Sequence, residues 1–117
     1  MKVKHGFIGF GNLAKAVYQG LKDEADIEFA YYARNRKEVD IPFYERMEDL
    51  VTFADVVWLM VKPQDLSLIL GELKQLNRAG KTIVSPVAGR TIAYIEHYLG
   101  TEQLIIRIMP NLAVAYR

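Results

Sequence analysis

Cysteine is absent from the 117-residue sequence. Its absence excludes a disulfide framework, a thiolate metal site and a cysteine nucleophile. An excess of charge of one sign is absent as well, because fifteen Lys and Arg residues face fourteen Asp and Glu residues and leave a net charge of +1. This balance provides no general attraction to nucleic acid or to an anionic membrane surface, and we expect neither as a partner.

Long hydrophobic runs are also lacking. No segment approaches the roughly 20 apolar residues that a membrane-spanning helix needs, and the apolar run at residues 7–11 is too short and too rich in glycine for a signal peptide. We therefore expect a cytoplasmic protein. The two histidines, His5 and His97, stand apart from any cluster of carboxylates. The sequence thus predicts no metal site, and it identifies no catalytic residue.

Short apolar runs alternate with helix-like segments along the chain. We expect strands at residues 3–10, 27–32, 41–44, 55–61, 81–87 and 104–109. We expect helices at residues 12–24, 45–53, 66–76 and 92–99, with N-caps at Asn12, Asp65 and Thr91 and a C-terminal glycine at Gly100. The first helix should bury the face that carries Leu13, Val17, Gly20 and Leu21, and Trp58, Tyr31 and Tyr32 are interpreted as core or sheet-face residues.

This alternation is typical of βαβ units and a parallel sheet. The run 55–61 is apolar on both faces, which indicates a central strand that is covered on both sides. We therefore predict a single α/β domain over residues 1–117, with a Rossmann-type, doubly wound, mainly parallel sheet in the order 3-2-1-4-5-6.

A glycine-rich turn joins the first expected strand to the first expected helix. Its pattern is G-x-G-x-x-A, which in this context is typical of a dinucleotide-binding turn. Gly9 would allow the tight turn, Gly11 would let the backbone approach a pyrophosphate, and Ala14 would let the helix pack closely on the strand. The N–H groups of Asn12, Leu13 and Ala14 would then face the anion. A structural glycine turn in another α/β protein is the alternative.

A basic turn follows the second expected strand. NAD-binding domains usually carry Asp or Glu there to bind the ribose 2′-hydroxyl, whereas this chain has Arg34, Asn35 and Arg36. Because a guanidinium pairs well with a phosphate, the turn favours NADP(H) over NAD(H). Arg34 and Arg36 are two residues apart, so in an extended stretch both side chains point to the same side. The sequence therefore leaves open which of them makes the contact. The alternative is a solvated basic surface turn.

The ends of the last three expected strands complete the predicted site, since ligands of open α/β sheets bind at the carboxyl ends of strands. We expect the nicotinamide and its ribose to lie against Val61, Lys62, Pro63, Ala88, Gly89 and Asn111. Lys62 could offer its charge or its aliphatic stem, and Asn111 could bind a carboxamide. Ordinary turn chemistry would also explain each of these residues.

Five segments together carry a resemblance to a known family, and they occur in its order and spacing: Gly9-Phe10-Gly11-Asn12-Leu13-Ala14, Arg34-Asn35-Arg36, Val61-Lys62-Pro63-Gln64, Ala88-Gly89-Arg90-Thr91 and Arg107-Ile108-Met109-Pro110-Asn111. The chain resembles the N-terminal dinucleotide-binding domain of pyrroline-5-carboxylate reductase. It departs from that family after Asn111, where Leu112-Ala113 stands in place of Thr-Pro.

The resemblance implies a function in proline biosynthesis. Hydride would pass from the nicotinamide of NAD(P)H to the imine carbon of 1-pyrroline-5-carboxylate, a small-molecule substrate, to give L-proline. The family's C-terminal helical domain, which forms its homo-oligomer and most of the substrate site, has no counterpart in these 117 residues. We therefore expect cofactor binding with little turnover by this chain alone.

Two alternatives remain open. A β-hydroxyacid dehydrogenase-like or deazaflavin-dependent NADP reductase would share the glycine turn and the basic turn. A stand-alone NADP-sensing module would be a protein without catalytic activity. The V-K-P-Q and M-P-N segments favour the reductase of pyrroline-5-carboxylate.

Overall fold

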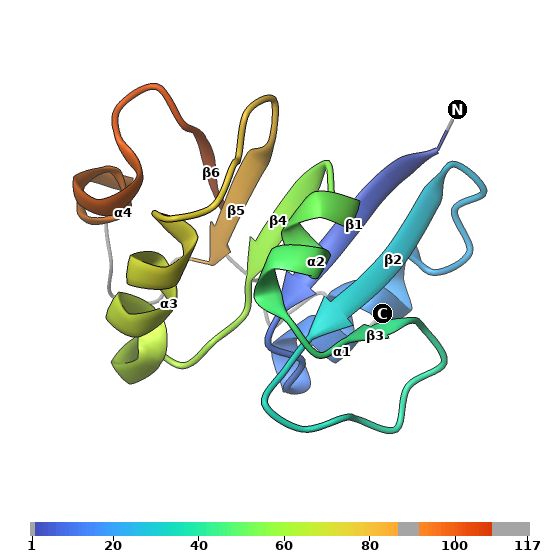
Figure 1. The fold of residues 1–117 in the computed structure, drawn as a ribbon. Coiled ribbons are helices and arrows are strands. Elements are labelled where there is room, and N and C mark those ends of the chain that lie inside the picture. The colour runs from blue at the N-terminus through green and yellow to red at the C-terminus, as the bar shows by residue number, and fades with distance from the viewer. Residues whose placement is uncertain (1, 87–91, 109–117) are drawn as a thin grey trace.

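A six-stranded sheet forms the centre of the molecule (Figure 1). The computed structural model describes residues 2–86 and 92–108. The strands are β1 (Val3–Ile8), β2 (Ile27–Tyr32), β3 (Phe43–Tyr44), β4 (Val56–Leu59), β5 (Thr82–Pro86) and β6 (Leu104–Ile108). Every neighbouring pair is parallel and the order is β3-β2-β1-β4-β5-β6. The predicted fold class and strand order are confirmed.

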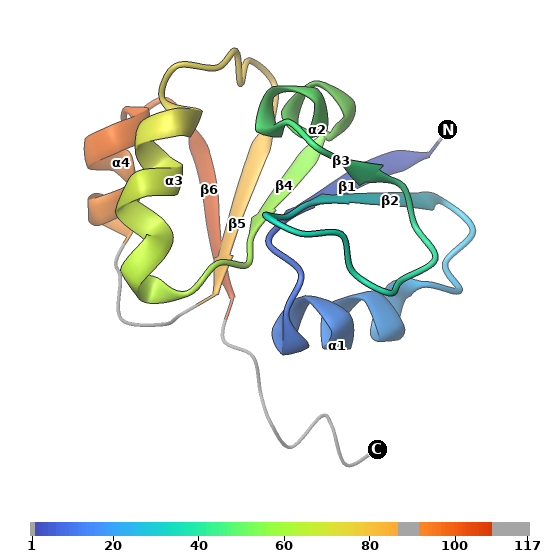
Figure 2. The same cartoon turned by 60° about the horizontal axis from the view of Figure 1, so that its bottom comes forward.

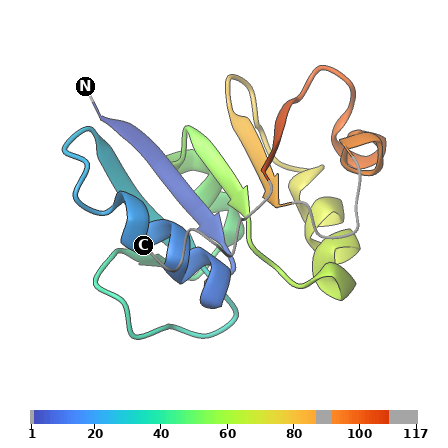
Figure 3. The same ribbon diagram turned by 180° about the vertical axis from the view of Figure 1, so that it is seen from behind.

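The helices cover the two faces of the sheet unequally. They are α1 (Asn12–Leu21), α2 (Met47–Phe53), α3 (Leu66–Leu73) and α4 (Ile92–Leu99), with a single 3₁₀ turn, η1 (Pro63–Asp65). Figure 2 shows α1 on one face and the other three helices on the opposite face. Seen from behind, α1 crosses in front of β1 and β2 (Figure 3). Right-handed crossovers explain this, because the chain leaves β1 toward one edge of the sheet and later leaves β4 toward the other.

Two apolar clusters fill the space between the sheet and these helices. The larger contains Leu50, Leu70 and Ile95 from the three helices on one face, and the smaller lies under α1. Strand β4 contributes to both clusters, because Val57 faces the larger and Trp58 the smaller. This double burial explains why residues 55–61 read as a continuous apolar run, and the predicted central position of this strand is confirmed.

Two predictions about α1 are wrong in detail. Gly11, and not Asn12, occupies the N-cap position, and the helix ends at Leu21 instead of continuing to residue 24. Of the predicted buried face, Val17 and Leu21 pack against the smaller cluster, whereas Gly20 is exposed. Ala14 is fully buried in the same cluster.

The later helices follow their predictions more closely. Asp65 is the N-cap of α3, as predicted, but its side chain makes no capping hydrogen bond, and the helix ends at Leu73 rather than at residue 76. Helix α4 has its predicted bounds. Gly100 follows it with a φ of +89°, and its N–H donates to the carbonyl of Glu96 at 2.8 Å. The expected cap at Thr91 lies outside the described residues.

Candidate functional site

Gly9 lies where three parallel strands end. Its φ is +89°, a conformation that favours glycine. Its N–H donates to the carbonyl of Tyr32 at 2.7 Å, and a Cβ atom on Gly9 would lie 2.7 Å from the carbonyl oxygen of Met60. The tight turn predicted at this position is therefore present, and it needs glycine for both conformation and space.

Gly11 has a different reason to be glycine. Its φ is −93°, which other residues adopt, and a Cβ atom there would meet nothing within 4 Å. Residues 2–86 and 92–108 therefore leave the space above Gly11 empty. A ligand that approaches the backbone would use this space, which agrees with the role predicted for Gly11 but does not test it.

The N-terminus of α1 suits an anion. The first turn has no acidic residue, and no side chain caps it. The N–H groups of a first helical turn have no partner within the helix, and the helix dipole makes this end electropositive. The N–H groups of Asn12, Leu13 and Ala14 therefore form a site whose chemistry fits a pyrophosphate.

The basic turn lies directly after β2, at the same edge of the sheet. Arg34, Asn35 and Arg36 are all exposed. Among the described residues neither arginine takes part in an ion pair. The guanidinium of Arg36 lies over the ring of Phe43, 5.9 Å from its centroid. Two positive charges are thus available to a ligand beside the glycine turn.

The end of β4 lies against the glycine turn. A Cβ atom on Gly9 would lie 3.2 Å from Val61 Cγ1, so Val61 neighbours Gly9 in space. Lys62 and Pro63 are exposed. Lys62 is the N-cap of η1, which begins at Pro63, and the N–H of Asp65 donates to the carbonyl of Lys62 at 2.9 Å. The structure thus brings the three segments 9–14, 34–36 and 61–63 to one edge of the sheet.

Three predicted site residues are not placed by the structure. Ala88, Gly89 and Asn111 lie outside the described residues. The nicotinamide side of the site beyond β4 therefore stays a prediction. Within the part of the chain that is described, no group of His, Asp and Glu residues could hold a metal ion, and no helix is long and apolar enough to cross a membrane.

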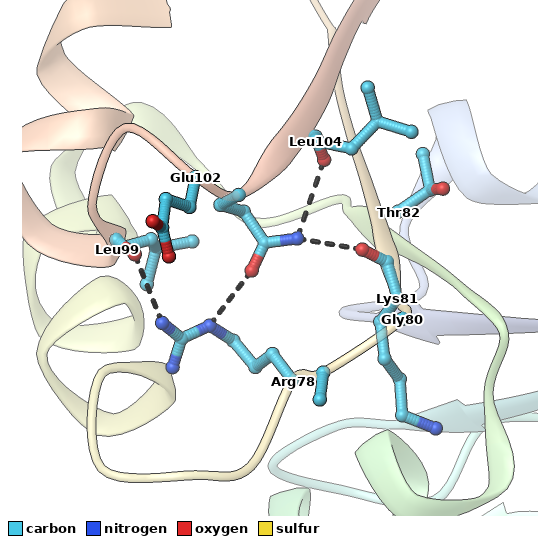
Figure 4. A pocket seen from close by; sticks show the side chains of 9 residues that line it. Arg78, Gly80, Lys81, Thr82, Leu99, Glu102 and Leu104 are labelled. Carbon is cyan, nitrogen blue, oxygen red and sulfur yellow. Dashed lines mark hydrogen bonds between the residues drawn. The ribbon is translucent and has the colours of Figure 1, made fainter.

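An open hollow of about 410 Å³ lies at the opposite edge of the sheet, where β5 and β6 begin (Figure 4). Its polar groups bind one another. Arg78 Nε donates to Gln103 Oε1 at 3.0 Å, and Gln103 Nε2 donates to the carbonyl of Lys81 at 2.7 Å. Arg78 also donates to the carbonyls of Leu73, Leu76 and Leu99.

These bonds make Arg78 a structural residue. It joins the end of α3, the end of α4 and the start of β6, and burial lowers the pKa of its guanidinium, which stays charged at neutral pH. Ligands of open α/β sheets bind at the other edge. Sequence reasoning missed Arg78, because no local pattern marks an arginine whose partners lie up to 25 positions away.

A family model described as "NADP oxidoreductase coenzyme F420-dependent" matches residues 4–89. Pyrroline-5-carboxylate reductase 3 of Danio rerio is 33% identical over 120 residues, which cover 95% of this chain and 42% of the relative. Pyrroline-5-carboxylate reductase of Escherichia coli is 30% identical over 121 residues, with coverages of 95% and 45%.

A solved structure shows the same likeness to pyrroline-5-carboxylate reductases. Pyrroline carboxylate reductase of Plasmodium falciparum, solved with NADP bound, superimposes with a TM-score of 0.85 at 27% identity, over 93% of this chain and 42% of that one. The resemblance inferred from the motifs is confirmed. The chain spans less than half the length of these relatives.

Proposed function

Because the chain belongs to the family of coenzyme F420-dependent NADP oxidoreductases, we propose that it is the NADP(H)-binding domain of a reductase of the pyrroline-5-carboxylate type. The observation that carries the proposal is the glycine turn, with Gly9 held against Met60 and open space above Gly11. The likeness to a reductase solved with NADP bound supports it. The residues at this edge of the sheet fit such a dinucleotide.

Each segment has a separate part in binding. The N–H groups at the start of α1 hold the pyrophosphate, and Gly11 leaves room for it. Arg34, Asn35 and Arg36 receive the 2′-phosphate and the adenine, and this selects NADP(H) over NAD(H) because no carboxylate repels the phosphate there. Val61, Lys62 and Pro63 flank the nicotinamide ribose, and we assign Ala88, Gly89 and Asn111 to the nicotinamide and its ribose from the sequence.

The proposed reaction is reduction of a small cyclic imine, 1-pyrroline-5-carboxylate, to L-proline. The bound cofactor supplies the hydride, which passes from nicotinamide C4 to the imine carbon. The chain's own residues orient the cofactor and keep water away from one face of it. The relatives are more than twice as long as this chain. We attribute most substrate contacts and the assembly of a homo-oligomer to the additional length, and we expect little turnover without it.

Calorimetric titration of the chain with NADPH and with NADH tests the proposal. We expect tighter binding of NADPH, weakened by salt because charges at an exposed turn are screened. Arg34→Ala and Arg36→Ala should each lose more affinity for NADPH than for NADH. Lys74→Ala is the control, since Lys74 is an exposed basic residue just beyond α3, away from the carboxyl ends of β1 and β2. Failure to bind either nucleotide would overturn the proposal, and equal losses for both would overturn the assignment of the 2′-phosphate.

The description of the family model supports a second candidate, an NADP reductase that uses the deazaflavin coenzyme F420. The two functions differ in the partner of NADP. NADPH-dependent reduction of coenzyme F420 by the full-length protein, without reduction of 1-pyrroline-5-carboxylate, would favour the second candidate. A cytoplasmic location stays an expectation from the sequence.

A further inference from the structure

A buried tyrosine hydroxyl closes the basic turn. Tyr31 lies in β2 and is fully buried. Its hydroxyl accepts a hydrogen bond from the N–H of Lys37 at 2.8 Å and donates one to the carbonyl of the same residue at 3.1 Å. The end of the strand and the end of the turn are thus tied together, six residues apart. The residues between them include the three that we propose to contact the 2′-phosphate.

The ring of Tyr31 supports the turn from below. The ring of Phe43 lies 5.1 Å from it, centroid to centroid, and the guanidinium of Arg36 lies over Phe43. The N–H of Tyr31 also donates to the carbonyl of Pro42 at 3.0 Å, which holds β3 beside β2. Tyr31, Phe43 and Arg36 therefore form a continuous series of contacts from the core to the surface.

The hydroxyl is dispensable for packing but not for the shape of the turn. A buried hydroxyl without a partner is costly. Both hydrogen bonds of this hydroxyl go to the backbone of Lys37, so the closed turn is what satisfies it. Phenylalanine would fill the same space between Phe10 and Phe43 without any need for the turn to close.

We propose that Tyr31 is the positioning residue of the basic turn, which holds Lys37 through its hydroxyl and Arg36 through Phe43 and so sets the selectivity for a 2′-phosphorylated nucleotide. This inference rests on the proposed function. A preformed turn loses less conformational freedom on binding than an open one. The benefit is larger for a ligand that carries the 2′-phosphate, because of the two groups that the turn receives only the phosphate pairs with the arginine charges, whereas the adenine is uncharged.

The test is Tyr31→Phe, with Tyr44→Phe as the matched control. Tyr44 is half-buried in β3 next to Phe43, and its ring packs against Phe53 on the other face of the sheet. We expect Tyr31→Phe to weaken the binding of NADPH by about 3–10-fold, the usual range for hydrogen bonds of this kind, and to weaken the binding of NADH by a clearly smaller factor. The affinity for adenosine 2′,5′-bisphosphate should fall by the same factor as that for NADPH, and the affinity for 5′-AMP should not. The control should change none of these affinities.

Hydrogen exchange of the Lys37 amide provides a measurement that needs no ligand. We expect it to become faster in Tyr31→Phe while the amides of β1 stay protected. Equal losses for NADPH and NADH would show a general structural role, and unchanged NADPH affinity with a freed Lys37 amide would show that closure does not matter for selectivity. Either result overturns the inference. If the unaltered chain did not prefer NADPH to NADH, the proposed function would lose its selectivity for NADP(H). In that case an unchanged exchange rate of the Lys37 amide in Tyr31→Phe would still overturn the inference about Tyr31.

Discussion

At the scale of single residues, Gly9 and Gly11 are glycines for different reasons. Gly9 combines a left-handed backbone with a Cβ position only 2.7 Å from a carbonyl oxygen, whereas Gly11 has an ordinary backbone and free space. The first is a requirement of the fold, and the second becomes a requirement only when a ligand is present. A sequence motif reads both as the letter G and cannot separate the two roles.

Alanine substitutions should separate them. Gly9→Ala should destabilise the domain by about 1–3 kcal/mol, because it forces a strained backbone, and should abolish NADPH binding. Gly11→Ala should cost less than about 1 kcal/mol of stability, as a poorer N-cap, yet weaken NADPH by roughly tenfold or more because its methyl group occupies the space for the pyrophosphate.

Chemical denaturation and calorimetry of the same samples measure both effects. Gly20→Ala is the control, because Gly20 lies in α1 with open space around it. It should gain about 0.5–1 kcal/mol and leave binding unchanged. Tight NADPH binding by Gly11→Ala would contradict the proposed place of the pyrophosphate.

His5 links the stability of the domain to pH. Its Nδ1 accepts a hydrogen bond from Trp58 Nε1 at 2.8 Å. Burial lowers the pKa of His5 from 6.5, and the charge of Asp55 opposes this in part. The unfolded chain therefore binds a proton before the native chain does. The contribution of His5 to the free energy of unfolding is fully present above pH 6.5. It is lost as the pH falls below that value and through the pKa of folded His5.

The single tryptophan of the chain reports this loss. Protonation of His5 removes the acceptor for Trp58, so the free energy of unfolding should begin to fall below pH 6.5, and native Trp58 fluorescence should change at the lower pH at which folded His5 takes up its proton. His5→Asn keeps an acceptor without the titration and should remove the loss of stability that begins just below pH 6.5. His97→Asn, at an exposed position of α4, should leave it as it is. An identical profile for His5→Asn would exclude His5 as the source.

At the scale of elements, the ends of helices and strands depend on distant partners. Helix α3 ends at Leu73, and Arg78 binds the carbonyls of Leu73 and Leu76 where periodicity alone extends the helix to residue 76. Strand β1 ends at Ile8 because Gly9 turns the chain. The apolar pattern continues past both ends, which is why sequence periodicity overestimated their length.

Arg78→Ala should therefore loosen two helices at once. It removes hydrogen bonds from Leu73, Leu99 and Gln103 together, and we expect a loss of about 1–3 kcal/mol in the free energy of unfolding. The ratio of NADPH to NADH affinity should stay the same, because the hollow lies at the opposite edge of the sheet. Lys74→Ala, exposed just beyond α3, is the control for denaturation. An altered nucleotide preference would indicate that the two edges are coupled.

At the scale of the whole molecule, the candidate site joins segments from both halves of the sheet. The glycine turn and the basic turn follow β1 and β2, and Val61 follows β4 on the other side of β1. From β1 the chain adds β2 and β3 toward one edge of the sheet, and it then adds β4, β5 and β6 toward the other edge. Open α/β sheets bind ligands at the point where this direction changes. A ligand there contacts both halves and should stabilise the domain as a unit.

NADPH should accordingly raise the melting temperature. At 100 times its Kd, a ligand that binds only the native state adds about 2.7 kcal/mol, which corresponds to roughly 10 °C for a domain of this size. NADH at the same concentration should give a smaller shift, and salt should reduce the difference between the two. Differential scanning calorimetry measures both, and equal shifts would contradict the selectivity.

Local sequence patterns are sufficient to predict the class of the fold, the strand order and the positions of the two turns. Alternating periodicity and the handedness of crossovers leave few other arrangements, and glycines and arginines mark turns locally. Four contacts follow from no such pattern and are seen in the folded chain: Gly9 lies against Met60, Tyr31 binds Lys37, Arg78 joins two helices, and His5 binds Trp58, 53 residues away. Such contacts depend on which side chains meet when the strands assemble, and local patterns carry no information about that.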